Sequence, residues 1–434
     1  MTSGVAAPTA RDVLAARNAT YVAFSACGFA FASWASRIPQ VRDGLGLSSA
    51  ELGLVLLAIA VGSLIALPLA GLIVHRLSSR TTVMVMSAVL GVGLVIAAVG
   101  YLIGVVPVLV GLLLIGFGNG AWDVAMNVQG ADVERRLGRS IMSRFHAGYS
   151  MGTVGGAAIG AAMVALHVPV TAHLVAVAVA VLITVPIAVR NFLPDTDHAA
   201  DQVAGDRVAG DQVAGDEPKP QVGLLTRWRE PRTLFIGLFV FAFAFAEGTG
   251  QDWIAVALID DRGTTAAAGT LGFATFLAAM TLARWFGTEL LDRFGRVPVV
   301  RALAVVATVG LLLFIFAPVT WLCFVGALLW GLGTSLGFPV GMSAASDDPA
   351  AAATRVSVVA SIGYCAFLSG PPLIGLLGEH VTVSKALTVV AAMLALAALI
   401  AGALRPPRTL PSSEAAADAV DTAVDTGGPG SALR

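Results

Sequence analysis

Apolar runs, each close to the length of a membrane-crossing helix, recur along the chain and are separated by short polar segments. A bilayer core takes about 20 residues of helix, and this length divides the sequence into twelve predicted spans. They are residues 18–37, 50–74, 81–104, 106–129, 144–166, 168–191, 232–257, 266–290, 298–317, 319–343, 355–377 and 383–404. The pattern predicts an all-α polytopic membrane protein with 12 transmembrane helices.

Polar, low-complexity stretches divide the twelve predicted spans into two groups of six. Residues 194–231 contain the repeat "DQVAGDRVAGDQVAGDE", which is too polar and small to build a core and is predicted to be a disordered linker. The N-terminal tail, 1–17, and the C-terminal tail, 406–434, flank the spans. The sequence therefore predicts two six-helix bundles, 18–193 and 232–405.

Positive charge is distributed unevenly between the loops. Most of the 26 lysines and arginines fall in the two tails, the linker and the loops after the second, fourth, eighth and tenth spans. Because positive residues gather on the cytoplasmic side, both termini are predicted to be cytoplasmic in a multi-pass protein of the inner (plasma) membrane. Only 12% of residues are charged, and the net charge of −1 gives no basic field for nucleic acid.

Polar side chains inside the spans are the candidates for function. Asn119, Asp123 and Asn127 recur every fourth residue of the fourth span and therefore share one helical face. Ionisable groups in a membrane usually face a partner or a water-filled cavity. The stripe therefore either lines an aqueous path or forms a hydrogen-bonded helix contact. Glu247 and Gln251 form a second pair four residues apart, in the seventh span.

Two basic side chains complete the candidate set. Arg284, in the eighth span, is expected either to pair with Glu247 or Asp123 or to extend to the interface. His146, at the start of the fifth span, either titrates near neutral pH or serves as a capping or packing residue. The predicted substrate and proton path comprises Asn119, Asp123, Asn127, His146, Glu247, Gln251 and Arg284. Asp252 is placed nearer the outside, in a solvated or headgroup position.

Small and aromatic residues in the spans carry packing signals. Glycines recur every fourth residue of the fifth span and predict a close-packing face, at Gly148, Gly152, Gly156 and Gly160. The three cysteines are interpreted as small packed hydrophobes. Most of the tryptophans in or beside spans are expected to anchor at the membrane interface, with stacking on a sugar as the alternative: Trp34, Trp122, Trp253, Trp285 and Trp330.

Two similar loops follow the second and eighth spans: "GLIVHRLSSR" (71–80) and "GTELLDRFGR" (287–296). The second resembles the G-x-x-x-D-R-x-G-R loop of the major facilitator superfamily. In the first loop His75 stands where Asp is usual, and Ser78 and Ser79 replace the glycine-containing turn. The resemblance implies cytoplasmic gating loops formed by Gly71, His75, Arg76, Arg80, Gly287, Asp292, Arg293, Gly295 and Arg296.

Within that superfamily, the polar residues of the spans resemble the fucose-permease branch. That branch has a carboxylate and an Asn four residues later in the fourth span, a Glu followed by an aromatic stretch in the seventh, and an Arg before an aromatic in the eighth. This chain matches with Asp123 and Asn127, Ala246, Glu247 and Trp253, and Arg284 and Trp285. Ala35 stands where the branch has an Asp in the first span, so the resemblance does not extend to fucose itself or to two-carboxylate coupling.

The resemblance implies a secondary active transporter that moves a small polar solute, with a sugar as one candidate, by alternating access. A proton is the expected coupling ion, carried by Asp123 or Glu247. No G-x-x-x-x-G-K-[ST] signature occurs, so ATP is not expected to drive transport. The alternatives are a proton-driven exporter of amphipathic small molecules and a non-transporting membrane solute sensor.

Other function classes find little support in the sequence. The six histidines and three cysteines are scattered, and no H-E-x-x-H motif occurs, so neither an enzyme nor a metal site is expected. No cofactor is expected. The expected partners are a small-molecule substrate, a proton and the lipid bilayer, and the chain is expected to be a monomer.

Overall fold

The computed structural model describes residues 8–138, 141–195, 227–348 and 351–406. Most of the predicted linker and C-terminal tail therefore lies outside the described residues. The first half of the chain forms α1 (Ala10–Ala35), α2 (Ile38–Leu45), α3 (Ser49–Gly100), α4 (Val105–Leu137), α5 (Met142–Ala165) and α6 (Val170–Val189). The second half forms α9 (Pro231–Arg262), α10 (Ala266–Phe294), α11 (Arg296–Phe316), α12 (Thr320–Thr334), α13 (Gly337–Ala345), α14 (Ala352–His380), α15 (Val383–Ala386), α16 (Thr388–Ile400) and the 3₁₀ helix η1 (Ala401–Leu404).

The helices correspond to the twelve predicted spans. By length and composition, nine segments of the described chain are apolar enough to cross a membrane. One of them, α3, is a run of 52 residues that contains two predicted spans. The remaining two predicted spans form α1 and α5, which carry more small and polar residues. The prediction of an all-α polytopic membrane protein with twelve spans is confirmed for the described chain.

Two predicted spans are interrupted where the sequence indicated single helices. The span predicted over 319–343 is divided between α12 and α13, with Ser335 and Leu336 between them. The span predicted over 383–404 is divided into α15, α16 and η1. The mean hydropathy stays high across both breaks, so hydropathy gives no signal for them. The first break frees a carbonyl group, that of Ser335, for a side-chain contact described below.

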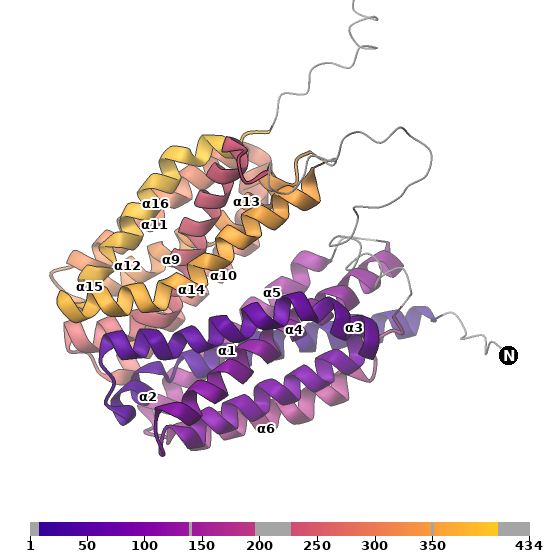
Figure 1. Ribbon diagram of the computed structural model, residues 1–434, viewed down its shortest axis with the longest axis horizontal. Helices are drawn as coiled ribbons and strands as arrows, with labels where there is room; N and C mark the ends of the chain where they lie inside the picture. The colour runs from indigo at the N-terminus through magenta and orange to yellow at the C-terminus, as the bar shows by residue number, and fades with distance from the viewer. Residues whose placement is uncertain (1–7, 139–140, 196–226, 349–350, 407–434) are drawn as a thin grey trace, which may run out of the picture.

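The two halves lie side by side and contact each other mainly through two helix pairs, α3 with α14 and α5 with α10, with a smaller contact between α2 and α9 (Figure 1). Their backbones approach closely near Gly53 and Gly375. A Cβ atom added at Gly53 would collide with the carbonyl of Pro371, and one added at Gly375 would collide with the carbonyl of Ser49. These contacts lie at the end of the molecule that carries α2, which we call the α2 end. The end that carries loops 71–80 and 287–296 is called the arginine-rich end.

The glycine stripe of α5 packs against α1, which confirms the predicted close-packing face. A Cβ atom at Gly152 would collide with the carbonyl of Ser25, and one at Gly156 with the carbonyl of Phe29. Gly155 faces away from this contact, and no heavy atom lies within 4 Å of its added Cβ position. The two helices are in backbone contact because helices satisfy their own peptide groups and need no side chains between them.

Replacing Gly152 by alanine is therefore expected to destabilise the protein. The added methyl group forces α5 away from α1, and overpacking of this kind costs about 1–3 kcal/mol. Gly155→Ala is the matched control in the same helix, since it adds a methyl group to open space and favours helix. Thermal unfolding of the purified protein should show a lower midpoint for Gly152→Ala alone. Equal midpoints for the two variants would contradict the packing.

The two arginine-rich loops have the same backbone conformation at one position each. Ser78 has φ 73° and ψ 156°, and Gly295 has φ 76° and ψ 157°. When the two loops are aligned on these positions, His75 is equivalent to Asp292 and Arg76 is equivalent to Arg293. The conformation is natural for glycine but strained for serine. After the strained residue, the backbone N–H of Ser79 donates to Asp195 at 2.5 Å.

We expect Ser78→Gly to stabilise the protein and Gly295→Ser to destabilise it. Strain of this kind costs about 1–3 kcal/mol and is partly offset by the greater freedom of glycine in the unfolded chain. The midpoint of thermal unfolding should therefore rise in the first variant and fall in the second. A lower midpoint for Ser78→Gly would show that the serine side chain stabilises this loop by more than its backbone conformation costs.

Carboxylates at the arginine-rich end bind arginines of the same half. Asp347 accepts from Arg232 at 2.6 Å and also from Arg296. Burial acts to raise the pKa of Asp347, but the hydrogen bonds from these two arginines outweigh it and lower the pKa. Arg296 is thus the member of the predicted gating loops that joins this ion-pair cluster.

A second cluster at the same end surrounds Arg355, which binds Glu230 at 2.6 Å and Asp348 at 3.0 Å. The hydrogen bond from Arg355 is the main cause of the lowered pKa of Glu230. In the first half, Asp132 binds Arg135 and Arg136, each at 3.0 Å. Among the described residues, the ion pairs at this end therefore each stay within one half.

Candidate functional site

An ion pair between α9 and α10 forms the charged part of the candidate site. Arg284 Nη2 lies 2.9 Å from Glu247 Oε1 and 2.8 Å from Oε2. Arg284 Nε donates to the free carbonyl of Ser335 at 3.0 Å, so the break between α12 and α13 orients the guanidinium. Gln251 Nε2 lies 3.4 Å from Glu247 Oε1. Of the alternatives for Arg284, the structure therefore shows pairing with Glu247.

On α4, in the other half, the carboxyl group of Asp123 has an amide neighbour. Asn127 Nδ2 donates to the backbone carbonyl of Asp123 at 2.8 Å and lies 3.3 Å from its Oδ1. Among the described residues, Asp123 forms no ion pair. Asn119 accepts from the thiol of Cys27 on α1 at 3.2 Å. All three polar residues of the stripe are partly exposed, so the face combines a hydrogen-bonded helix contact with access to water.

Two side chains of α5 lie near these groups. Tyr149 is close enough to Asp123, Glu247 and Arg284 to interact with them electrostatically, so it lies near polar groups of both halves. His146 is exposed, is within range of Arg284 and packs its ring edge-on against Phe24 at 5.2 Å. The structure thus brings residues of α1, α4, α5, α9 and α10 around one location.

Two members of this set, Tyr149 and Cys27, were not predicted as site residues from the sequence. Tyr149 lies three residues after His146 and shares its helical face, which was a usable signal. Cys27 was interpreted as a packed hydrophobe, but its thiol donates to a polar residue of the candidate path. Asp252, next to Gln251 on α9, is partly exposed and makes no hydrogen bond or ion pair with another described residue.

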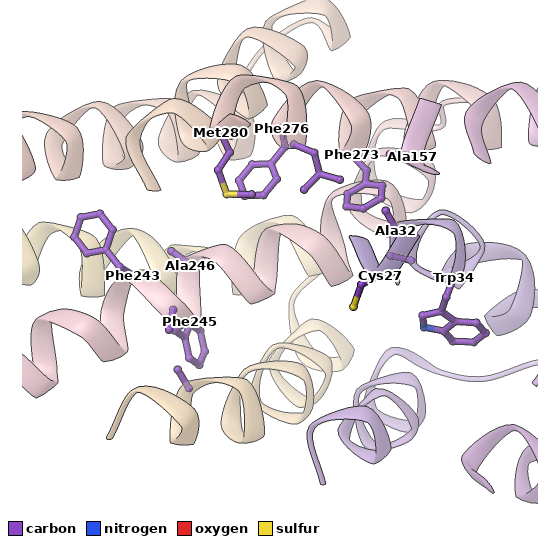
Figure 2. Packing of buried hydrophobic residues seen from close by; sticks show 14 of the residues in the cluster. Cys27, Ala32, Trp34, Ala157, Phe243, Phe245, Ala246, Phe273, Phe276 and Met280 are labelled. Atoms are coloured by element: carbon purple, nitrogen blue, oxygen red, sulfur yellow. The ribbon is translucent and has the colours of Figure 1, made fainter. Parts of the chain in front are cut away.

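Four of the five tryptophans singled out in the sequence are buried inside the protein. Their side chains are at most 1% exposed, so the anchoring prediction is wrong for Trp34, Trp122, Trp253 and Trp330. Trp330 packs edge-on against Phe276 and Phe314, with ring centroids 5.3 and 6.0 Å away. Trp34 lies in the buried apolar core with Phe273 and Phe276 (Figure 2). Trp285 is 59% exposed, as an anchor would be.

The remaining members of the predicted gating loops lie at the arginine-rich end. Asp292, Arg293 and Gly295 are exposed, and the guanidinium of Arg293 lies 5.2 Å from the centre of the Phe294 ring. Gly287 is buried against Leu336 in the break between α12 and α13. Within the described residues, no group of three or more His, Cys, Asp or Glu side chains could hold a metal ion.

Two helical halves that enclose partly exposed polar groups within membrane-spanning segments define a membrane transport protein. The comparison with known families agrees: the Major Facilitator Superfamily model matches residues 19–250 and 249–425. The chain belongs to the major facilitator superfamily. It is a secondary transporter of the membrane and not an enzyme.

Similar proteins from other organisms cover most of the chain. An uncharacterized MFS-type transporter of Yersinia pestis is 30% identical over 86% of this chain and 92% of its own length. An uncharacterized transporter of Sinorhizobium fredii is 32% identical over 87% of this chain and 95% of its own length. The membrane protein MosC of Rhizobium meliloti is 29% identical over 84% of each chain.

Solved structures show the same fold. A mutant of the nucleoside transporter NupG has a TM-score of 0.70 at 14% identity, covering 91% of this chain and 99% of that chain. A variant of the Escherichia coli fucose:proton symporter FucP has a TM-score of 0.57 at 17% identity, covering 90% of this chain and 98% of that chain. At these identities the likeness establishes the arrangement of helices.

The Glu247–Arg284 pair predicts strongly non-additive effects of substitution. Glu247→Gln or Arg284→Gln alone leaves a charge without its partner inside the membrane-spanning region, and each should lower the midpoint of thermal unfolding. The double variant removes both charges and should be more stable than the sum of the two losses predicts, with a coupling of about 1–3 kcal/mol. Additive losses would show that the pair contributes little to the fold.

Proposed function

We propose that the protein is a proton-coupled symporter that takes up a small polar solute, with neutral sugars as the first candidates. The observation that carries the proposal is the difference between its two central carboxylates. Glu247 binds Arg284 in the second half, whereas Asp123 in the first half has an amide neighbour and no ion pair among the described residues. Asp123 is partly exposed, so water can deliver a proton to it.

The roles of the two carboxylates follow from these surroundings. A carboxylate bound by arginine is stabilised in its charged form, which opposes proton uptake. A carboxyl group with no cation beside it can change between its neutral and charged forms more easily than one held by arginine. Asp123 is therefore the proposed proton carrier. Glu247 and Arg284 are proposed to bind the solute and hold its orientation.

The proposed solute class follows from the charges and hydrogen-bonding groups of the site. With Asp123 protonated, the positive charge of Arg284 balances Glu247, so a neutral solute adds no unpaired charge. Hydroxyl groups can bond to the amide, carboxylate and guanidinium groups supplied by Asn119, Asn127, Gln251, Glu247 and Arg284. The names of two proteins with this fold, a fucose:proton symporter and a nucleoside transporter, support a polar, hydroxyl-bearing solute. His146 and Tyr149 are proposed to line the same path.

The positive-inside rule orients the proposed transporter. The arginine-rich end and both termini face the cytoplasm, and the α2 end faces the outside of the plasma (inner) membrane. Contacts between the halves at the α2 end support a conformation closed to the outside. Loops 71–80 and 287–296 are then the proposed cytoplasmic gating loops. One chain contains both halves of the site, which supports a monomer as the transporting unit.

Uptake into proteoliposomes with an imposed pH gradient tests the proposal. A panel of neutral sugars and nucleosides is screened with the unaltered protein, and the active solute is then used with Asp123→Asn. This variant should lose pH-driven uptake by at least about tenfold, because the amide cannot carry a proton. It should still exchange internal for external solute, because exchange does not require net proton movement.

Asp252→Asn is the matched control, since it replaces a partly exposed carboxyl group of α9 by the same amide. Uptake driven by pH should persist in this variant. If Asp252→Asn loses proton coupling and Asp123→Asn keeps it, the proton carrier is Asp252 on α9 and not Asp123. Solute uptake that ignores the pH gradient in the unaltered protein would contradict proton coupling altogether.

A further inference from the structure

Arg42 on α2 joins the two halves of the molecule at the α2 end. It donates from Nη2 to Asp260 Oδ1 at 2.8 Å and from Nη1 to Asp260 Oδ2, and Asp260 lies near the end of α9 in the other half. Among the described residues, this is the ion pair that connects one half with the other. The Arg42 side chain is 10% exposed, so the pair is partly withdrawn from water.

Arg42 also binds a carboxylate of its own half. Its Nε and Nη2 lie 2.9 and 2.7 Å from Asp43 Oδ1. Asp43 is the next residue of the same helix, so it moves with Arg42 when the halves separate. Asp260 does not. The guanidinium therefore has two kinds of partner: Asp43 stays beside it in every conformation, and Asp260 is lost when the α2 end opens.

The surrounding contacts show that this ion pair lies on the interface that must open. Thr270 of α10 is fully buried; its hydroxyl donates to the carbonyl of Ala266 in its own helix at 2.9 Å and lies 3.5 Å from the carbonyl of Ser36, in the other half. The backbone N–H of Ala50 lies 3.4 Å from Glu379 Oε2, again across the two halves. A hollow of about 570 Å³ at the surface is lined by residues of both halves, including Arg42, Asp43, Asp260 and Glu379. Water therefore reaches the ion pair from this end.

We propose that Arg42 forms a latch on the outer face with two carboxylate partners that have opposite effects. Its ion pair with Asp260 holds the two halves together, and its ion pair with Asp43 lowers the free energy needed to separate them. The latch rests on the orientation and alternating access of the proposed function. Without Asp260, the closed state loses its ion pair across the interface. Without Asp43, Arg42 binds Asp260 undivided in the closed state and has no partner in the open state. The two carboxylates of one arginine therefore act in opposite directions on the same equilibrium.

Labelling of a buried cysteine measures that equilibrium without any solute. The reporter is Thr270→Cys in a chain whose native cysteines, Cys27, Cys323 and Cys365, are replaced by alanine. A membrane-impermeant maleimide is added from the outside of right-side-out vesicles, and the labelling rate is recorded. Asp260→Asn should raise the rate about fivefold, in line with the strength of a partly exposed ion pair. Asp43→Asn should lower it by a similar factor.

A third substitution tests whether both effects pass through the guanidinium. Arg42→Gln should raise the labelling rate as Asp260→Asn does, and Asp43→Asn should have no effect in the Arg42→Gln background. Faster labelling in Asp43→Asn would overturn the proposal, because it would show that Asp43 only orients Arg42 towards Asp260. An effect of Asp43→Asn that persists without Arg42 would overturn it as well.

The controls separate this latch from folding and from the transport proposal. Labelling after denaturation in detergent and the midpoint of thermal unfolding show that each variant contains the cysteine and is folded. If the replacement of Cys27 prevents folding, the same rates are measured with only Cys323 and Cys365 replaced, since only the difference between variants is used. Labelling that responds only to reagent on the cytoplasmic side would refute the orientation. Failure to find a transported solute would leave the labelling result unchanged.

Discussion

The structure depends on one constraint: a charged side chain between membrane-spanning helices must be compensated by an opposite charge, by hydrogen bonds or by water. The Glu247–Arg284 pair meets this constraint with a salt bridge and with a carbonyl that the break after α12 releases. Asp123 meets it differently, through Asn127 and partial exposure. The two solutions lie in different halves, so the chemistry of the site changes whenever the halves move relative to each other.

Small residues provide the geometry that this constraint requires. The glycines of α5 bring α1 within backbone contact, and Gly53 and Gly375 do the same for α3 and α14 across the two halves. Helices can approach so closely because their peptide groups are already bonded internally. The large aromatic side chains are then buried within the halves, as Trp330 is between Phe276 and Phe314.

The sequence predicted the number and class of helices because hydrocarbon thickness imposes a length that can be counted directly. It did not predict the breaks at Ser335 and within the last span, since the mean hydropathy stays high across both. Periodicity predicted that the residues of the α4 stripe share a face, and also the contact of the α5 glycines. Periodicity did not identify the partner of Arg284, because Glu247 is 37 positions away in the sequence and the two residues come together only in the folded chain. Tyr149, in contrast, could have been predicted, since it shares a helical face with His146.

Charged residues are paired within one half at one end of the molecule and across the two halves at the other end. This difference affects which end can open. At the arginine-rich end, Asp347 and Asp132 bind arginines of their own half, so the halves can separate there without leaving a charge unpaired. At the α2 end, Arg42 is shared across the interface. Opening at that end must therefore break an ion pair, and a partner that moves with Arg42 keeps the guanidinium compensated after the break. A transporter that closes its two ends in turn needs contacts of this kind, which can break without leaving a charge unpaired.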